Sequence, residues 1–354
     1  MASRNPHLSI KLEGHQDPLE PLARVVSVED NDRLVDEARL TFKDPDGNGA
    51  GMFQTGRKLT VEMGWDGEFA VLLEGPVVES RPLAAAEGMR SLTVVARDMS
   101  HKMSTEELTR LYSAGPLQTI VESVASRNGW TGANAHITCD PNPRLTDHND
   151  LFQHDETDYR YLQRLAERYG ARAFVEYNDG RSQFYFVSNR TLLEADALGR
   201  LEYCRGLNKL IEFKYQSIAA RAARQYVASA VDPVSGETRT TQGDSPPTSE
   251  VAAPAATAAE PTVVPAGPSD PGAAERLTVN DPTRVLGLRG DGRAVGTVIL
   301  RAKGKVEIIG LPPWAAGDWY VSKATHTWRD TTTPDDLSGR ETKSSYETSF
   351  TATR

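Results

Sequence analysis

The sequence predicts a mainly β protein in which an α/β insertion separates two antiparallel β-domains. Short segments of alternating polar and apolar residues fill both ends of the 354-residue chain, with turn residues between them. One-faced helical patterns are confined to the middle of the chain. With 38% hydrophobic residues, the chain is long enough for two or three domains. We expect an N-terminal β-domain at 1–98, an α/β insertion at 99–200 and a second β-domain at 201–354.

The first block is expected to contain only strands. These are Leu8–Leu12, Ala23–Val28, Glu37–Phe42, Lys58–Met63, Ala70–Val78 and Ser91–Val95. Segments 44–49 and 64–67, which carry Asp and Gly, provide clear turns between them. Because no convincing helical pattern interrupts this block, we favour an antiparallel sheet closed as a barrel or sandwich.

The second block combines two helices with a hairpin. Pro116 suits the first position of a helix that ends at Asn128-Gly129. A second helix starts near Asp155 and Thr157, the candidate caps, and stops at Gly170. The apolar faces of these helices comprise Leu117, Ile120, Val121 and Val124 in the first, and Leu162, Leu165, Ala166 and Tyr169 in the second. Two strands, Ala171–Tyr177 and Gln183–Val187, then form a hairpin around residues 178–180.

The third block is predicted to be a second β-domain with a long interruption. Its strands are Lys209–Tyr215, Ala223–Ser229, Gly296–Ala302, Lys305–Ile309, Asp318–Thr327 and Ser344–Thr353. Between about 230 and 272 the chain is rich in Pro, Ala, Ser, Thr and Gly, with few large apolar residues. Such a segment cannot offset an ordering entropy of ~1–2 kcal/mol per residue, so we expect a flexible loop without regular structure.

Composition excludes several classes of function. A formal charge of -9 without a cluster of basic residues argues against nucleic acid binding, including sequence-specific recognition. The two cysteines, Cys139 and Cys204, are far apart and indicate neither a disulfide framework nor a thiolate zinc site. We expect no signal peptide and no membrane span, because the chain shows neither an apolar leader nor a long apolar run.

Acidic residues and histidines around residue 150 form the best candidate for an active or metal site. The cluster comprises Asp140, Asp147, His148, Asp150, His154, Asp155, Glu156 and Asp158. Such groups can bind a metal ion or supply the acid and base of a cell-wall glycosidase. However, the histidines lie six residues apart in a loop, not at the i, i+4 spacing of a helical zinc site, and no apolar pocket is evident to raise a carboxyl pKa. We interpret the cluster as a solvated loop with helix caps.

No other motif indicates catalysis. His326 has no Ser, Cys or Asp partner at a recognisable spacing. The glycine-rich segment 287–292 lacks the lysine and the following helix of a phosphate-binding loop, so we interpret it as a turn. The sequence therefore predicts no catalytic, cofactor-binding or metal-binding residue, and no cofactor.

Segment Gln153–Gly170, with the sequence QHDETDYRYLQRLAERYG, resembles the signature QxxESDxxFLxRLAxxxG of the phage late control protein D family. Thr157 replaces the serine of that signature and Tyr161 its phenylalanine. Similar motifs follow the family order elsewhere: EARLTF at 37–42, GxxLxV at 56–61, LEGxV at 73–77, RD at 97–98, GxWxVxxAxH at 317–326 and YxTxF at 346–350. The family covers baseplate hubs of contractile phage tails and injection systems, and the hub portion of type VI secretion spike proteins. The match also implies that His326 is a structural strand residue.

The resemblance implies two tube-protein-like β-barrel domains and a structural role. Three chains would form a homotrimeric, quasi-six-fold ring that joins the central spike to the inner tube, because six similar domains can dock a hexameric tube while the chains remain three-fold for the spike. Expected partners are a spike or needle protein, the inner tube protein and baseplate wedge components. The alternative is a cell-wall hydrolase carried at the tip.

The resemblance also implies a location. We expect assembly in the cytoplasm and incorporation into a phage tail or an extracellular injection particle. The sequence ends at Arg354. We therefore expect the spike domains to lie on another polypeptide.

Overall fold

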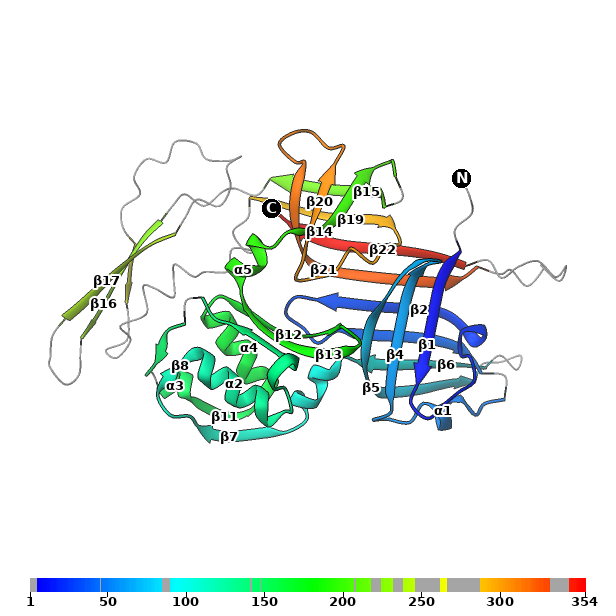
Figure 1. Cartoon of the computed structure of the whole chain (residues 1–354), viewed down its shortest axis with the longest axis horizontal. Coiled ribbons are helices and arrows are strands. Elements are labelled where there is room, and N and C mark those ends of the chain that lie inside the picture. Colours follow the sequence, from blue (N-terminus) through cyan, green and yellow to red (C-terminus); the bar gives the residue numbers. More distant parts are fainter. Residues whose placement is uncertain are drawn as a thin grey trace.

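Two β-domains and a smaller α/β domain make up the described part of the protein (Figure 1). The computed structural model describes residues 5–44, 46–84, 90–140, 142–146, 148–206, 208–217, 224–231, 238–245, 262–265, 287–331 and 344–354. The predicted fold class, mainly β with an α/β insertion, is confirmed. Among the described residues, none of the helices has the length and apolar character needed to cross a bilayer.

The N-terminal domain contains all six strands that the sequence predicts there. They are β1 (Pro6–Leu12), β2 (Ala23–Asn31), β3 (Glu37–Lys43), β4 (Lys58–Trp65), β5 (Glu68–Ala84) and β6 (Arg90–Arg97), with a short helix α1 (Gly49–Met52) between β3 and β4. Alternate residues such as Leu40, Val61 and Val94 face a common core. Trp328 and Tyr346, from the other end of the chain, complete this core.

The insertion has its own core and contains both predicted helices. Its helices are α2 (Leu117–Arg127), α3 (His148–Leu151), α4 (Asp158–Arg168) and α5 (Asn189–Glu194), and its strands are β7 (Glu107–Leu111), β8 (Gly115–Pro116), β9 (Ala135–Thr138), β10 (Arg144–Leu145), β11 (Phe152–Thr157), β12 (Ala171–Asn178) and β13 (Arg181–Ser188). Every residue of the two predicted apolar faces is buried. Asp179 and Gly180 turn the β12–β13 hairpin with positive φ angles of 51° and 79°.

Thr157 is the residue that caps α4. Its side chain accepts a hydrogen bond from the backbone N–H of Arg160 at 3.2 Å. The other candidate cap, Asp155, was a wrong prediction: it lies in β11 with a φ of 45°, where the pairing with β7 shifts register. Gly170 follows the helix with a φ of 65°, as predicted for its stop.

The C-terminal domain is a closed six-stranded barrel. Its strands are β14 (Ala197–Tyr203), β15 (Lys209–Ser217), β19 (Leu288–Val295), β20 (Lys305–Ile309), β21 (Gly317–Asp330) and β22 (Ser344–Thr353). The ladder runs β21-β20-β14-β15-β19-β22 and closes through β21–β22 pairing. The pairings are antiparallel except those of β14, which runs parallel to both β15 and β20.

Two predictions in the third block were wrong. Residues 288–292 of the segment 287–292, which was interpreted as a turn, belong to strand β19, and the predicted strand Gly296–Ala302 is a loop. The glycines of β19 mark close packing, because a Cβ at Gly290 or Gly292 would lie 2.4 Å from ring atoms of Phe213 or Phe350. Their presence therefore reflects aromatic side chains that cover the strand, not a turn.

Segment 230–272 also departs from the expected absence of regular structure. The backbone of β16 (Arg224–Val231) pairs with β17 (Thr238–Ser245) and β18 (Thr262–Pro265) in a three-stranded sheet. Threonine and valine, which favour extended backbone, are frequent in β17 and β18. The rest of this segment lies outside the described residues, and its flexibility stays a prediction.

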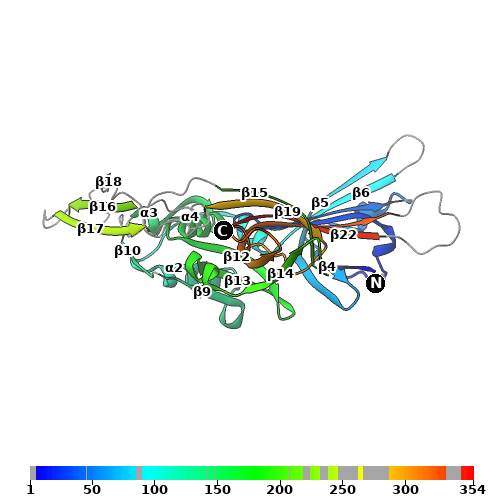
Figure 2. The ribbon, with the colours of Figure 1, turned by 90° about the horizontal axis from the view of Figure 1, so that it is seen from above.

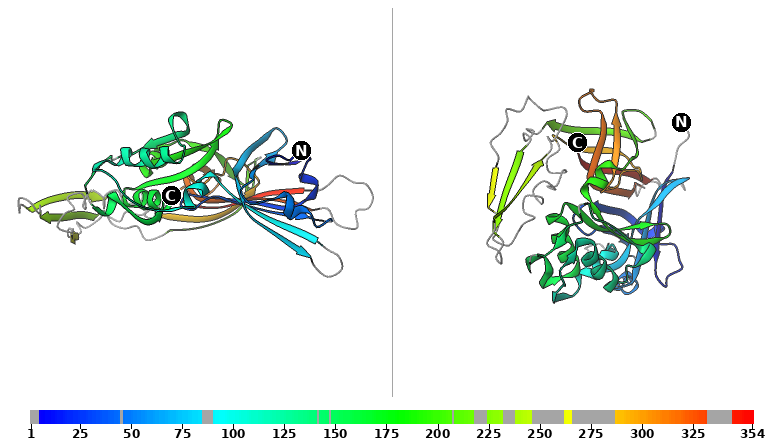
Figure 3. Two further views of the ribbon diagram at one scale, coloured as in Figure 1. Left: turned by 90° about the horizontal axis from the view of Figure 1, so that it is seen from below. Right: turned by 60° about the vertical axis from the view of Figure 1, so that its left-hand side comes forward.

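A continuous antiparallel sheet of eight strands connects the two β-domains. Its order is β5-β6-β3-β2-β21-β22-β19-β15, and the β2–β21 pairing is the joint between the domains. In Figure 1 these strands are stacked from β15 at the top to β5 at the bottom. The β5–β6 and β21–β22 strands extend toward the same end of the molecule, and the insertion helices lie toward the other end (Figures 2 and 3).

Candidate functional site

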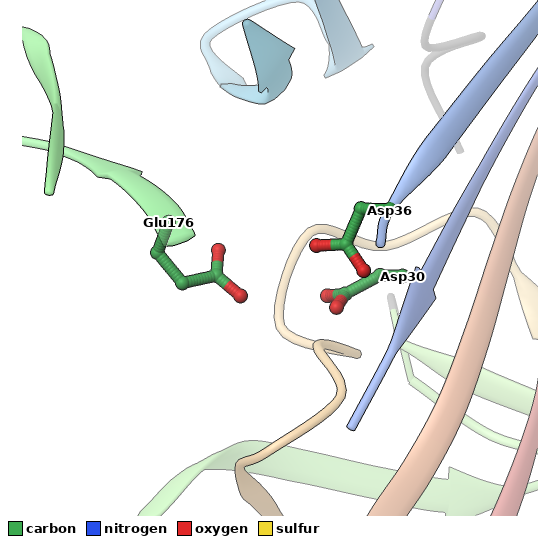
Figure 4. A group of neighbouring side chains, drawn as sticks. All are labelled: Asp30, Asp36 and Glu176. Atoms are coloured by element: carbon green, nitrogen blue, oxygen red, sulfur yellow. The ribbon is translucent and has the colours of Figure 1, made fainter. Parts of the chain in front are cut away.

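The most concentrated group of buried charges lies where the three domains meet. Asp30 and Asp36 come from β2 and the turn after it, and Glu176 comes from β12 of the insertion. Arg301 and Lys303 come from residues 296–304 of the C-terminal domain, which we call the junction loop. These five residues form the ionic junction, and Figure 4 shows its three carboxylates converging from opposite sides.

Lys303 is the centre of the ionic junction. Its Nζ lies 2.6 Å from Asp30 Oδ1, 2.8 Å from Glu176 Oε1 and 3.1 Å from Asp36 Oδ2. Arg301 adds a 3.0 Å contact from Nε to Asp30 Oδ2 and a second ion pair with Glu176. Because the Lys303 side chain is only 3% exposed, water contributes little screening to these contacts.

The junction loop also makes uncharged contacts with the N-terminal domain. The indole N–H of Trp65 donates to the carbonyl of Gly296 at 2.6 Å, and Arg301 Nη1 donates to the carbonyl of Val71 at 3.3 Å. The backbone N–H of Ala302 donates to Asp30 Oδ2 at 3.0 Å. Nine residues of one loop therefore fix three domains against one another.

The same three carboxylates have the geometry of a metal-ligand group. One oxygen from each of Asp30, Asp36 and Glu176 lies within 4.8 Å of the others. Hard divalent cations prefer such oxygen ligands. In this protein the ammonium of Lys303 lies at hydrogen-bonding distance from all three carboxylates, so the chain itself supplies the cation that this donor set attracts.

Burial and neighbouring charge shift the pKa values of the junction in different directions. Burial would raise the pKa of Asp30, but Lys303 and Arg301 outweigh it and lower that pKa. For Asp36, burial and the nearby acids outweigh Lys303 and raise the pKa well above its usual value. Burial also raises the pKa of Asp98, whose carboxylate accepts the Asp36 N–H, to about 6. Asp30 and Asp36 therefore differ in protonation because the buried acids share only two cations, Lys303 and Arg301.

The acidic cluster near residue 150 is held by other protein groups. Asp150 lies 2.9 Å from Arg168 and accepts a hydrogen bond from Tyr169. Asp158 pairs with Arg127 and accepts hydrogen bonds from Asn128 and Gln153 at 2.7 and 2.9 Å. Glu156 pairs with Arg164 at 2.5 Å, and Asp140 with Arg190 at 3.3 Å.

The remaining members of that cluster do not converge. Asp155 accepts a hydrogen bond from Thr109 at 2.5 Å, and the exposed His154 stacks on Phe152 at a centroid distance of 5.3 Å. His148 also packs against the Phe152 ring, with the two ring centroids 5.0 Å apart. Asp147 lies outside the described residues. The structure therefore distributes these side chains over several separate contacts.

His326 is enclosed in the C-terminal domain. Its ring nitrogens lie 2.9 Å from the Leu300 carbonyl and 2.7 Å from the Tyr346 hydroxyl. Burial, reinforced by Arg301, lowers its pKa to about 4, so the ring is neutral at neutral pH. These contacts tie the junction loop to β21 and β22.

Comparison with protein families gives one decisive match. Residues 39–332 match the phage tail baseplate hub (GPD) family. The chain belongs to this family. The resemblance seen in the sequence motifs is thereby confirmed, and membership of a structural hub family implies a non-enzymatic role. A search of curated proteins gave no match to this hub-family chain.

Solved structures of tail and secretion proteins share the fold of this hub protein. The 43 kDa tail protein of prophage MuSo2 from Shewanella oneidensis superposes with a TM-score of 0.64 at 13% identity, covering 99% of this chain and 98% of that protein. The E. coli c3393 protein, a type VI secretion component described as similar to T4 tail proteins gp27 and gp5, has a TM-score of 0.63 at 12% identity, with coverages of 97% and 76%. A tail protein from Neisseria meningitidis MC58 gives 0.62 at 12% identity, with coverages of 99% and 97%.

The ionic junction of this hub protein was not predicted from the sequence. Arg301 was assigned to the strand Gly296–Ala302 and Lys303 lay between two predicted strands, and their acidic partners lie more than 100 residues away in the chain. The one available signal was the charged Arg301 inside a predicted strand, since such residues are rarely buried unless paired. The partners themselves become visible only in the folded chain.

Asp36→Asn is expected to change the pH dependence of hub stability. The raised pKa of Asp36 contributes stability that is complete below the unfolded pKa of about 4 and is lost as pH rises through the folded pKa. The melting temperature of Asp36→Asn should therefore rise relative to that of wild type as pH rises from about 5 to about 8. Glu37→Gln, on the neighbouring strand β3, is the control. Parallel wild-type and Asp36→Asn curves over this range would contradict the expectation.

Proposed function

We propose that three copies of this hub-family chain form a ring that joins the central spike to the inner tube of a contractile tail or injection particle. The observation that carries the proposal is the repeated organisation of the eight-stranded sheet. Strands β5-β6-β3-β2 form one half and strands β21-β22-β19-β15 the other. Three chains would contribute six such halves, which suits a hexameric partner.

The two ends of the molecule support different symmetries. Each half of the sheet begins with a hairpin, β5–β6 or β21–β22, that extends toward the same end (Figure 2). Three chains would present six hairpins there, and we assign that end to the tube. The insertion occurs once per chain and lies toward the other end, so three copies suit a three-fold spike.

Partners and location follow from this arrangement. A solved Francisella PdpA-VgrG complex contains a chain that shares the fold at a TM-score of 0.55 and 10% identity, with coverages of 99% and 58%. A spike or needle protein, the inner tube protein and wedge components are the partners of the proposed ring, which assembles in the cytoplasm before it enters the particle. We further propose domain boundaries at 1–98, 99–200 and 201–354, supported by three separate apolar cores.

Measurement of the oligomeric state tests the proposed function. Native mass spectrometry of the chain, alone and co-expressed with the tube and spike proteins of its gene cluster, is expected to give a trimer in the second case. Electron micrographs of the assembled particle should show one ring of three chains at the spike base. A dimer, a hexamer, or a monomer under both conditions would contradict the proposal.

A peptidoglycan zymogram tests the competing hydrolase function. The carboxylates near residue 150 are engaged by arginine, tyrosine, asparagine, glutamine or threonine side chains, so we expect the purified protein to give no clearing. Glu156→Gln and Asp155→Asn are the matched variants. Clearing by the wild type that either variant abolishes would overturn the structural role.

A further inference from the structure

Three aromatic side chains gather at one end of the C-terminal barrel. Tyr203 ends β14, Tyr215 lies near the end of β15, and Trp314 lies in the loop 310–316 between β20 and β21. The ring centroids of Tyr215 and Trp314 are 5.3 Å apart. A Cβ added at Gly310 would lie 3.3 Å from the Cβ of Tyr203, so the same loop also contacts Tyr203. We call Tyr203, Tyr215 and Trp314 the aromatic patch.

The described residues leave much of the aromatic patch open to solvent. Tyr203 and Trp314 are each 44% exposed, and Tyr215 is half-buried. Trp314 differs in this respect from the other four tryptophans of the chain, which are buried or half-buried. A group of large apolar side chains at the surface marks a site of interaction, because each ring on its own would gain by burial.

The chain itself contains a short sequence with the chemistry to bind such rings. Pro265, Pro268 and Pro271 recur at every third residue of the segment PAGPSDP, and Pro265 is the last residue of β18. A polyproline II helix has three residues per turn, so it would align these prolines in one ridge with a spacing of about 9 Å. Segments with this spacing dock on aromatic surfaces at low entropic cost, because the polyproline II conformation is preformed. We call these three residues the proline triplet.

Both ends of the long segment that carries the proline triplet start from the strands beside the aromatic patch. β15 ends at Ser217, β19 begins at Leu288, and these two residues pair with each other. Tyr215 lies two residues before Ser217 on the same strand. Leu288 follows Pro271 by 17 residues, a stretch that spans at most about 60 Å when it is fully extended. The triplet is therefore tethered within reach of the patch, at an effective concentration of about 1 mM.

The charges beside the aromatic patch suit the same segment. Arg354 Nη1 donates to the carbonyl of Trp314 at 3.3 Å, which places a cation beside that residue. The segment 265–271 contains one charged residue, Asp270, which lies between the last two prolines of the triplet. A carboxylate on the flank of the proline ridge is complementary to the guanidinium of Arg354.

We propose that the segment 265–271 docks on the aromatic patch of its own chain, with the prolines of the triplet against the rings of Tyr203, Tyr215 and Trp314. The contact lies within one chain, so it forms in a monomer as well as in a trimer. It goes beyond the proposed function and does not depend on it. The long segment between β15 and β19 would then be attached to the barrel at a third point, besides its two ends.

Hydroxyl-radical footprinting of the complete chain tests the docking, with oxidation of Trp314 measured by mass spectrometry. The variant combines Pro265→Ala, Pro268→Ala and Pro271→Ala. If the free segment binds the patch with a Kd of about 0.1 mM, an effective concentration of about 1 mM keeps it about 90% bound. Trp314 should then be oxidised about tenfold faster in the variant than in wild type. Trp319, which is fully buried, is the internal reference for an intact barrel.

A second triple variant is the matched control for this experiment. It removes three prolines of the same long segment that are seven residues apart, through Pro247→Ala, Pro254→Ala and Pro261→Ala. Because these prolines do not form a ridge of the polyproline II kind, Trp314 in this variant should be oxidised at the wild-type rate.

Each other outcome of the footprinting would overturn the proposal. Equal oxidation of Trp314 in wild type and in the proline-triplet variant would show that the segment does not dock there. Equal effects of the two triple variants would show that the spacing of the prolines is irrelevant. Protection of wild-type Trp314 that is lost on dilution from about 10 µM to about 0.1 µM would place the segment on a second copy, since a contact within one chain is independent of concentration.

Limited proteolysis provides a second readout, on the segment itself. Trypsin cuts after Arg276, which follows Pro271 by five residues, and a docked segment is a poor substrate because a protease needs several extended residues around the bond. Trp314→Ala should therefore speed this cut several-fold. Leu83→Ala, which removes a side chain that is 61% exposed on β5, is the control and should leave the rate unchanged. Equal cleavage rates in wild type and Trp314→Ala would contradict the docking.

Discussion

Lys303→Met is expected to lower the free energy of unfolding by about 3–5 kcal/mol, the typical effect of removing one partner from a buried charge group. Methionine has a side chain of similar length but no charge. Asp30 and Glu176 then keep their ion pairs with Arg301, whereas Asp36 loses its 3.1 Å contact with the Lys303 ammonium. All three carboxylates come from domains other than the one that carries Lys303. We therefore expect the loss to appear first as separation of the domains. Chemical denaturation should show a lower midpoint, and limited proteolysis should cut the junction loop faster than in wild type.

Lys323→Met is the matched control for this variant. Lys323 pairs with Glu29 at 2.8 Å, but both side chains are about two-fifths exposed. Exposed pairs of this kind contribute ~0–1 kcal/mol because water screens them. If both variants lost the same free energy of unfolding, burial of the Lys303 ion pairs would add nothing to stability. That result would contradict the role assigned to the ionic junction.

Local sequence signals predicted those elements whose boundaries depend on neighbouring residues. α4 was predicted from the 3–4 residue spacing of Leu162, Leu165 and Ala166, and the structure buries all three. The β12–β13 hairpin was predicted because Asp179 and Gly180 tolerate positive φ. Errors arose where distant residues decide the conformation. Gly290 and Gly292 belong to a strand because Phe213 and Phe350, far away in the sequence, cover them.

The candidate site shows the same contrast between local contacts, which the sequence predicts, and contacts between distant residues, which it does not. Capping by Thr157 is local and was predicted, whereas Lys303 receives its three partners from positions 127 to 273 residues earlier, as the residue numbers 30, 36 and 176 show. No periodicity links such residues. The loop that carries Lys303 also has a positive φ of 66° at that residue, a conformation that is uncommon for residues other than glycine. Family resemblance supplied the role of the chain, and the folded structure supplied the contact that unites its domains.

Asp158→Ala is expected to cost about 2–4 kcal/mol, because it removes the shared acceptor of a largely buried network. Arg127, Asn128 and Gln153 all donate to the Asp158 carboxylate. Burial would raise the pKa of Asp158, but these hydrogen bonds and the charge of Arg127 outweigh it and lower that pKa. The stabilisation is therefore present above the unfolded pKa of about 4 and is lost as pH falls through the folded pKa. Urea unfolding at neutral and acidic pH measures both effects.

Asp155→Asn separates this structural role from the general acidity of the segment. The Asp155 side chain is 73% exposed, accepts a hydrogen bond from the Thr109 hydroxyl and lies 3.9 Å from a ring nitrogen of His154. Asparagine tolerates the positive φ of 45° at this position, and such exposed substitutions change stability by about 0.5 kcal/mol or less, so Asp155→Asn should unfold with nearly the wild-type midpoint. The two aspartates are three residues apart, yet one joins α2 to the start of α4 and the other borders solvent. If Asp155→Asn and Asp158→Ala were equally stable, the Asp158 network would not hold the helices of the insertion together.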